Sequence, residues 1–256
     1  KAEQLAPFIP APSEGLNARS YSPFPVPWAV VDSSDTPALS RKHAIIIGGG
    51  LAGCTSARAL AERGWQVILL ERHDQLALEA SGNPQGVLYA KLSHKQEAQA
   101  EFNLTALQYA LGFYQSRWPD IGCQAGVLQL AYSEAEQQLQ QLLSERFAQA
   151  SPLVEFVTAE QAGAIAGVKL QQPGLYFPQA GWISPSRLCE SLVKHQSIQV
   201  VTQCEAVRLE QPEPEQQPNW TVLTAEGELI AAAPVVVIAN ARDAKHFEYT
   251  QYLPIK

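Results

Sequence analysis

The stretch HAIIIGGGLAG, residues 43–53, decides the fold, because an apolar run passes directly into a cluster of glycines. The β-branched run at 43–47 predicts a strand buried on both faces of a parallel sheet. The glycines that follow have the G-x-G-x-x-G spacing of dinucleotide-binding turns. The first allows a tight turn, the second lets the backbone approach a pyrophosphate, and the third lets helix and strand pack closely. These glycines are Gly48, Gly50 and Gly53.

A helix is expected directly after the glycine turn. Residues 51–63 have helical spacing of apolar side chains, and Gly64 can end the helix. The amides at its start have no partner within the helix, and the positive end of the helix dipole lies there too. The turn therefore predicts an anion site. The apolar positions expected to face the sheet are Leu51, Ala52, Ala59 and Leu60.

A second apolar strand is predicted at 65–70, and Glu71 stands at its end. A carboxylate about 20 residues after the glycines accepts hydrogen bonds from an adenosine ribose and repels a 2′-phosphate. The combination of strand, turn, helix, strand and acid favours a dinucleotide site over a glycine loop that only packs. These residues alone leave NAD and FAD as alternatives.

Composition limits the class of protein. The chain has 256 residues, 46% hydrophobic and 17% charged, which is typical of a globular protein of one large or two modest domains. A net charge of −7 disfavours nucleic-acid binding through the overall field, although a local basic patch remains possible. The four cysteines lack zinc-site spacing and indicate reduced thiols. We find no transmembrane run and no signal-peptide pattern, and expect a soluble, cytoplasmic protein.

Several further elements can be placed along the chain. Residues 1–40 are rich in proline and predict a linker. Thr158 and Gln161 form a capping box at the start of a short helix, and Ser184 followed by Pro185 predicts the cap of another. The buried strand predicted within APVVVIANA, residues 233–241, can rejoin the first sheet beside the glycine turn.

Five stretches together resemble a known family: HAIIIGGGLAG, LLER, ALEASGNPQGVLYAKLS, LYFPQAGWISPSRL and VVVIANA. They are similar to the FAD-dependent oxidoreductase part of the bacterial bifunctional proteins that make 5-methylaminomethyl-2-thiouridine in tRNA. That part belongs to the D-amino-acid oxidase-like superfamily. The resemblance implies an α/β fold, in which a Rossmann-like FAD-binding domain carries an inserted mixed-sheet substrate domain, truncated at the C-terminus. The implied boundaries are 1–40 for an interdomain linker, 41–120 and 184–256 for the FAD-binding domain, and 121–183 for the substrate domain.

The resemblance also implies FAD as the cofactor and a set of residues that contact it. One departure is visible: the family commonly has glycine where this chain has Ala241. If that glycine serves a positive φ, alanine there would be strained. The implied contacts are Gly48, Gly49, Gly50, Leu51, Ala52 and Gly53 at the pyrophosphate, Glu71 and Arg72 at the adenosine ribose, Ser81, Gly82, Gln85 and Gly86 on the flavin side, Val207 at the adenine, and Ala239 and Asn240 under the cofactor.

The implied reaction is oxidative removal of the carboxymethyl group from 5-carboxymethylaminomethyl-2-thiouridine at the tRNA wobble position. The resulting aminomethyl group would be methylated by a separate upstream domain of the same polypeptide that uses S-adenosylmethionine. We nominate no catalytic residue and no metal ligand. Two alternatives remain: an FAD-dependent oxidase of free glycine or sarcosine-type amino acids, and a non-catalytic dinucleotide-binding module.

Overall fold

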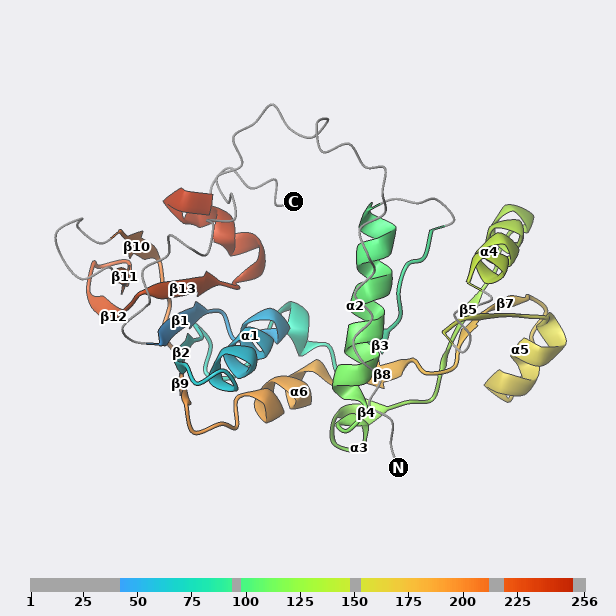
Figure 1. Cartoon of the computed structure of the whole chain (residues 1–256), viewed down its shortest axis with the longest axis horizontal. Coiled ribbons are helices and arrows are strands. Elements are labelled where there is room, and N and C mark those ends of the chain that lie inside the picture. The colour runs from blue at the N-terminus through green and yellow to red at the C-terminus, as the bar shows by residue number, and fades with distance from the viewer. Residues whose placement is uncertain (1–41, 94–97, 148–152, 212–218, 251–256) are drawn as a thin grey trace. The chain divides into compact units, whose positions relative to one another are not determined.

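The computed structural model of the chain describes residues 42–93, 98–147, 153–211 and 219–250 (Figure 1). The linker predicted at 1–40 therefore lies outside the described residues. Within the described ranges, no helix is both long and apolar enough to cross a membrane.

A parallel sheet of four strands holds the glycine turn. The strand that precedes the glycine turn, residues 43–47, is an inner strand of this sheet. It lies between the strand at residues 66–70 and the returning strand at residues 235–238. The expectation that the returning strand rejoins the first sheet is confirmed, whereas its residues are only partly buried and not fully buried as predicted. The strand order is β13 (Val235–Ile238), β1 (His43–Ile47), β2 (Gln66–Leu70), β9 (Ile198–Val201).

The side chains of β1 alternate between two hydrophobic cores, as the period of a strand requires. Ile46 packs on one face, against helices α1 (Leu51–Ala61) and α6 (Pro185–Leu192). Ile45 and Ile47 pack on the other face, against an antiparallel sheet. The strands of that sheet are β10 (Arg208–Glu210), β11 (Trp220–Leu223) and β12 (Leu229–Ala233).

Helix α1 is shorter than predicted and buries a different face. It ends at Ala61, and the next residues continue as a tight turn to Gly64, whose φ is +80°. Ala52, expected to face the sheet, is exposed, whereas Leu51 and Leu60 only flank the core. Small residues bring the helix close to the sheet: Gly53, Cys54, Ala57 and Ala61 are the buried ones.

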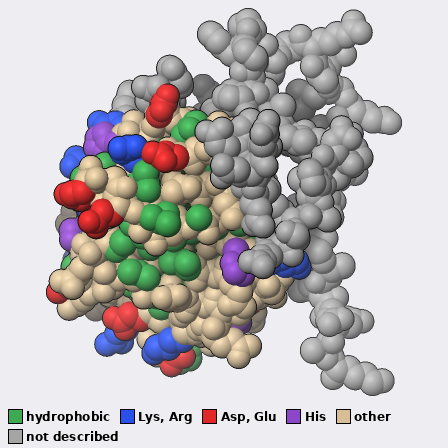
Figure 2. Space-filling view, turned by 90° about the vertical axis from the view of Figure 1, so that its left-hand side faces the viewer, with side chains coloured by type: hydrophobic (Ala, Val, Ile, Leu, Met, Phe, Trp, Pro, Cys, Tyr) green, Lys and Arg blue, Asp and Glu red, His purple; other side chains and the backbone are tan. Residues whose placement is uncertain are grey.

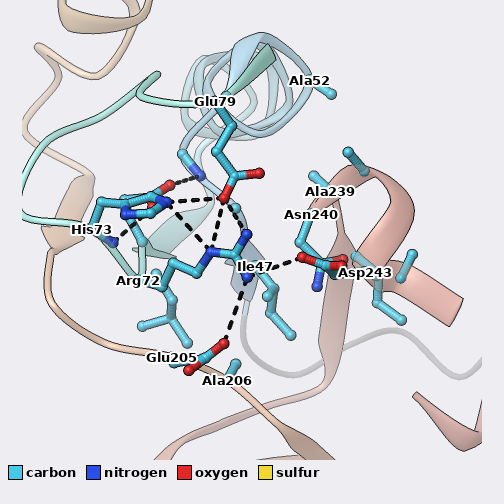
Figure 3. Close-up of a pocket in the computed structure, with 18 of the residues that line it drawn as sticks. Ile47, Ala52, Arg72, His73, Glu79, Glu205, Ala206, Ala239, Asn240 and Asp243 are labelled. Carbon is cyan, nitrogen blue, oxygen red and sulfur yellow. Dashed lines mark hydrogen bonds and ion pairs between the residues drawn. The ribbon is translucent and has the colours of Figure 1, made fainter. Parts of the chain in front are cut away.

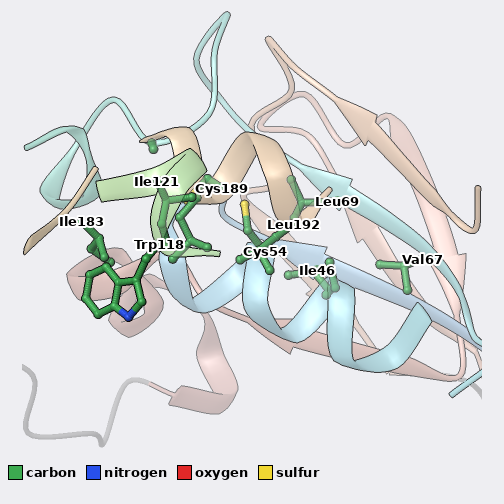
Figure 4. Close-up of a cluster of buried hydrophobic side chains, with 12 residues drawn as sticks. Ile46, Cys54, Val67, Leu69, Trp118, Ile121, Ile183, Cys189 and Leu192 are labelled. Carbon is green, nitrogen blue, oxygen red and sulfur yellow. The ribbon is translucent and has the colours of Figure 1, made fainter. Parts of the chain in front are cut away.

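Two buried thiols join α1 to α6 (Figure 4). Cys54 and Cys189 are both fully buried, and their thiols contact each other. The neighbouring Cys189 thiol, together with burial, raises the pKa of Cys54. The Cys54 Sγ also donates to the Gly49 carbonyl at 3.4 Å. Cys54 therefore packs in the hydrophobic core, and its thiol contacts the backbone of the glycine turn at Gly49.

The rest of the described chain forms two small antiparallel sheets with helices. Their strand orders are β3-β8-β4 and β5-β7-β6. The strands are β3 (Gly86–Leu88), β4 (Gly122–Cys123), β5 (Val127–Leu130), β6 (Glu155–Val157), β7 (Gly174–Phe177) and β8 (Gly181–Ile183), and the helices are α2 (Ala98–Tyr114), α3 (Trp118–Ile121), α4 (Glu134–Arg146) and α5 (Ala159–Ala166). Short 3₁₀ turns occur at η1 (Ala80–Gly82), η3 (Ala241–His246) and η4 (Glu248–Thr250).

Core contacts bear on the predicted domain boundaries without deciding them. Leu107 and Leu111 of α2 pack in one cluster with Leu175 and Phe177 of β7. Helix α2 thus shares a core with the segment predicted as the substrate domain, although it precedes residue 121. The boundaries at 120 and 183 stay predictions.

Of the two predicted helix caps, one is confirmed and one is wrong in its detail. Thr158 and Gln161 form the complete capping box at the start of α5. Ser184 occupies the N-cap position of α6, but its hydroxyl makes no capping bond. Instead the Ser184 hydroxyl lies 3.2 Å from the Ser186 hydroxyl, and the two hydroxyls form a hydrogen bond with each other.

Candidate cofactor site

A cavity of about 750 Å³ opens at the carboxyl ends of the parallel strands. That is the edge where doubly wound sheets bind ligands, and the volume lies in the range of cofactor pockets. The cavity is built from segments far apart in sequence that the sheet brings together. They are residues 47–52, 70–73, 77–81, 204–207 and 238–244, with His246 and Phe247.

The glycine turn is held tightly between β1, β2 and β13. Gly48 has a φ of +108°, and its amide donates to the Leu70 carbonyl at 2.8 Å. A Cβ at Gly48 would lie 2.7 Å from the Ala239 carbonyl oxygen. A Cβ at Gly53 would lie 1.9 Å from the Gly48 carbonyl oxygen. The first glycine therefore makes the turn and the third makes the close helix packing.

The amino end of α1 presents backbone donors to the cavity. Two nearby amides are already used: Gly49 donates to Glu71 Oε2, and Leu51 donates to the Ser81 hydroxyl at 3.0 Å. The amides of Gly50 and Ala52 have no hydrogen-bond partner among the described residues, and both residues line the cavity. Unpaired amides at a helix start suit an anion such as a pyrophosphate.

Glu71 is buried at the end of β2, with 7% of its surface exposed. Its Oε2 accepts the Gly49 amide at 2.8 Å, and its Oε1 accepts the His73 amide at 2.9 Å. A carboxylate has about four acceptor positions. Glu71 therefore holds the glycine turn and keeps acceptor capacity for ribose hydroxyls.

Beside Glu71, the Arg72 guanidinium lies among three carboxylates (Figure 3). Its Nε donates to Glu79 at 2.9 Å, and its Nη2 is also bonded to Glu79. Its Nη1 lies 2.9 Å from Asp243 and 3.6 Å from Glu205. The ring of His73, 2.9 Å from Glu79, and the Arg72 guanidinium lower the pKa of that carboxyl.

The end of β13 closes the cavity beside the glycine turn. The Ala239 amide donates to the Ile47 carbonyl at 2.8 Å. The side-chain oxygen of Asn240 is buried without a partner among the described groups, so it is free to accept a donor from a ligand. Ala241 has a φ of +51°, which confirms that this position requires the left-handed region.

The structure brings most of the predicted contact residues together. All of them line the cavity except Gly53, Gly82, Gln85 and Gly86. Gly53 packs behind the turn, Gly82 lies in η1, and Gly86 pairs with Ile183 in a separate sheet. The unpaired amides, the Asn240 oxygen and the cavity volume fit a bound dinucleotide. Sequence reasoning missed Glu79, Glu205 and Asp243, because no local pattern links three acids so far apart.

Comparisons with known proteins agree with this geometry. The model of the family described as FAD dependent oxidoreductase matches residues 43–253. A tRNA 5-methylaminomethyl-2-thiouridine biosynthesis bifunctional protein MnmC from Pseudomonas fluorescens is 43% identical over 224 residues, covering 86% of this chain and 32% of the relative. The protein of the same name from Pseudomonas putida is 39% identical over 257 residues, covering 100% of the chain and 38% of the relative. The chain thus spans about a third of the length of these curated relatives.

Solved structures show the same fold at low identity. Glycine oxidase from Geobacillus kaustophilus has a TM-score of 0.63 at 21% identity, covering 79% of this chain and 56% of that one. L-proline dehydrogenase from P. horikoshii has a TM-score of 0.62 at 17% identity, covering 84% and 57%. Because the family model matches most of the chain, the protein belongs to the FAD dependent oxidoreductase family, with a D-amino-acid oxidase-like fold.

Proposed function

We propose that this chain supplies the FAD-dependent step that removes the carboxymethyl group from 5-carboxymethylaminomethyl-2-thiouridine at the tRNA wobble position. The product would be 5-aminomethyl-2-thiouridine. The observation that carries the proposal is the identity of 43% and 39% to relatives named for this tRNA modification. The second match covers the whole chain, and with it every segment that lines the cavity. The relatives are much longer, so their activity is extended to this chain as a proposal.

The chemistry fits the substrate. The side chain of this substrate is an N-substituted glycine. When bound, FAD would serve as the acceptor of a hydride from the glycine carbon beside the secondary amine. Water then splits the resulting imine of the substrate into glyoxylate and the aminomethyl group. We assign the chain's residues to holding and orienting the cofactor. The amides of Gly50 and Ala52 would bind the pyrophosphate, and Glu71 would bind the adenosine ribose.

The remaining predicted contacts stay part of this proposal. They are Gly82, Gln85 and Gly86 on the flavin side, with Ser81 at the helix start. Ser81 lines the cavity, whereas Gly82, Gln85 and Gly86 lie outside its lining, so contact of these three residues with FAD requires the cofactor to reach past η1 toward β3.

The partners proposed are a modified tRNA and a methyltransferase domain of the same polypeptide. The printed name of the relatives, a bifunctional protein, supports the second. The face shown in Figure 2 mixes acidic and basic side chains around a group of hydrophobic ones, without an extended basic patch. With a net charge of −7, contacts to tRNA phosphates would need basic surface elsewhere. A tRNA substrate would place the enzyme in the cytoplasm.

The test is a visible absorption spectrum of the purified protein, repeated under argon after adding tRNA that carries the carboxymethylaminomethyl group. We expect loss of the oxidised flavin bands and release of glyoxylate, with no change for tRNA that lacks the modification. Bleaching by free glycine or sarcosine instead would replace the proposal with a small-molecule oxidase. A flavin that responds to neither would leave a non-catalytic dinucleotide-binding module.

A further inference from the structure

The Arg72 guanidinium is fixed by acids from three separate segments. Glu79 comes from the loop after β2, Glu205 from the loop after β9, and Asp243 from η3 after β13. Figure 3 shows the guanidinium between these three side chains. Asp243 is the least exposed of the acids, with 17% of its side chain exposed, and it makes the shortest contact to Nη1, at 2.9 Å. The guanidinium thus has one defined orientation at the cavity wall.

This arrangement uses the edge of the guanidinium and leaves its faces free. All three nitrogens of Arg72 are already paired with a carboxylate. Cation–π contacts within the described residues occur at Arg117 and Arg146, and none covers Arg72. A planar guanidinium stacks well on flat rings, which a lysine ammonium does not. Because Arg72 lines the cavity with 37% of its side chain exposed, a face is available to a ligand.

A phosphate is a poor ligand for this arginine. Phosphates bind arginine through its N–H edge, and here each of the three nitrogens on that edge already contacts a carboxylate. Three carboxylates surround the guanidinium, and even with Arg242 at 3.8 Å from Asp243 the cluster carries more negative than positive charge. An uncharged flat group suits this environment better than a phosphate does.

The position along the cavity indicates which flat group. Glu71, the proposed ribose ligand, immediately precedes Arg72, and Ala206 and Val207 line the same cavity. A ring attached to that ribose has to lie beside it. We propose that Arg72 is a stacking platform for the adenine ring of the bound dinucleotide, and that Glu79 and Asp243 are positioning residues that hold its plane. The inference rests on the proposed cofactor site.

The test compares two ligands on the cofactor-free protein: FAD, and inorganic pyrophosphate as a probe without the adenine. Arg72→Lys keeps the charge and loses the plane, so FAD affinity should fall about three- to tenfold. Pyrophosphate affinity should not change. Asp243→Asn should weaken FAD in the same direction by a smaller factor, because the plane is held less firmly. The matched control is Arg208→Lys, an exposed arginine paired with Glu210 outside the cavity, which should leave both affinities unchanged.

Three other outcomes would contradict either the stacking role of Arg72 or the cofactor site itself. Wild-type FAD affinity in Arg72→Lys overturns the stacking role while leaving the cofactor site intact. An equal loss for FAD and pyrophosphate makes Arg72 a phosphate ligand and overturns the inference. A wild-type protein that does not bind FAD overturns the cofactor site and the stacking role together. Thermal unfolding of every variant shows whether it is folded before affinities are compared.

Discussion

Replacing Gly48 with alanine should cost stability in two ways, through strained backbone at positive φ and through a steric clash of the new Cβ. Replacing Gly64 with alanine is the matched control, because it introduces the first cost without the second. Both glycines have positive φ, +108° and +80°. A Cβ at Gly64 meets nothing within 4 Å, whereas one at Gly48 meets the Ala239 carbonyl oxygen at 2.7 Å and the Asn240 Cα at 3.0 Å. Left-handed backbone costs alanine about 1–2 kcal/mol. Overpacking against backbone adds about 1–3 kcal/mol, since those atoms cannot rotate away.

We therefore expect Gly64→Ala to lose about 1 kcal/mol of the free energy of unfolding and Gly48→Ala about 3 kcal/mol. Urea denaturation followed by circular dichroism measures both. FAD titration should show weaker binding only for Gly48→Ala, because the clash pushes β13 away from β1 at the cavity. Equal losses of stability in the two variants would refute the reasoning, since the steric contact would then contribute nothing.

Three further predictions concern the cavity. Glu71→Ala removes the acceptor for two backbone amides, so it should lower the free energy of unfolding by about 2–4 kcal/mol and weaken FAD retention. The control Glu62→Ala, on the exposed surface, should lower the free energy of unfolding by less than about 1 kcal/mol. Unchanged flavin content in Glu71→Ala would contradict the ribose assignment. Ala241→Gly should raise the free energy of unfolding by up to about 1 kcal/mol, because strain at φ +51° is relieved, and a loss in urea denaturation would contradict that strain. The folded-state pKa of Glu79 is below its usual 4.5, so its ion pairs stabilise the fold above that pH and weaken as pH falls through the lowered value. The stability difference between wild type and Glu79→Gln should shrink in acid, and a constant difference would contradict the linkage.

The sequence was sufficient where a local pattern had a single structural solution. The apolar run ending at Ile47 could only be a buried strand once glycines followed it, and its predicted bounds are those of β1. Glu71 was found because its distance from the glycines is set by one helix and one strand. At Ala241 the resemblance supplied a glycine for comparison, so strain was expected if that glycine serves a positive φ, and the observed φ is +51°.

Other features depend on tertiary contacts and could not be predicted from the local sequence. Ala52 looked like a core residue by helical spacing, but the helix presents its smallest residues to the sheet and turns Ala52 toward the cavity. The hydroxyl of Ser184 found Ser186 in place of a backbone amide. The carboxylates around Arg72 come from loops that meet only because strands distant in sequence become neighbours at one edge of the sheet.

The pairing of β1 with β13 has a consequence for synthesis on the ribosome. Ala44 pairs with Val235, so the inner strand waits for about 190 residues before its second neighbour is translated. During that interval one edge of β1, with its run of isoleucines, has no partner strand, and such edges promote aggregation. Pairings between residues so far apart also form slowly. We expect nascent chains that end before residue 235 to depend on chaperones. The glycine turn should become rigid only after β13 has been translated and has paired with β1.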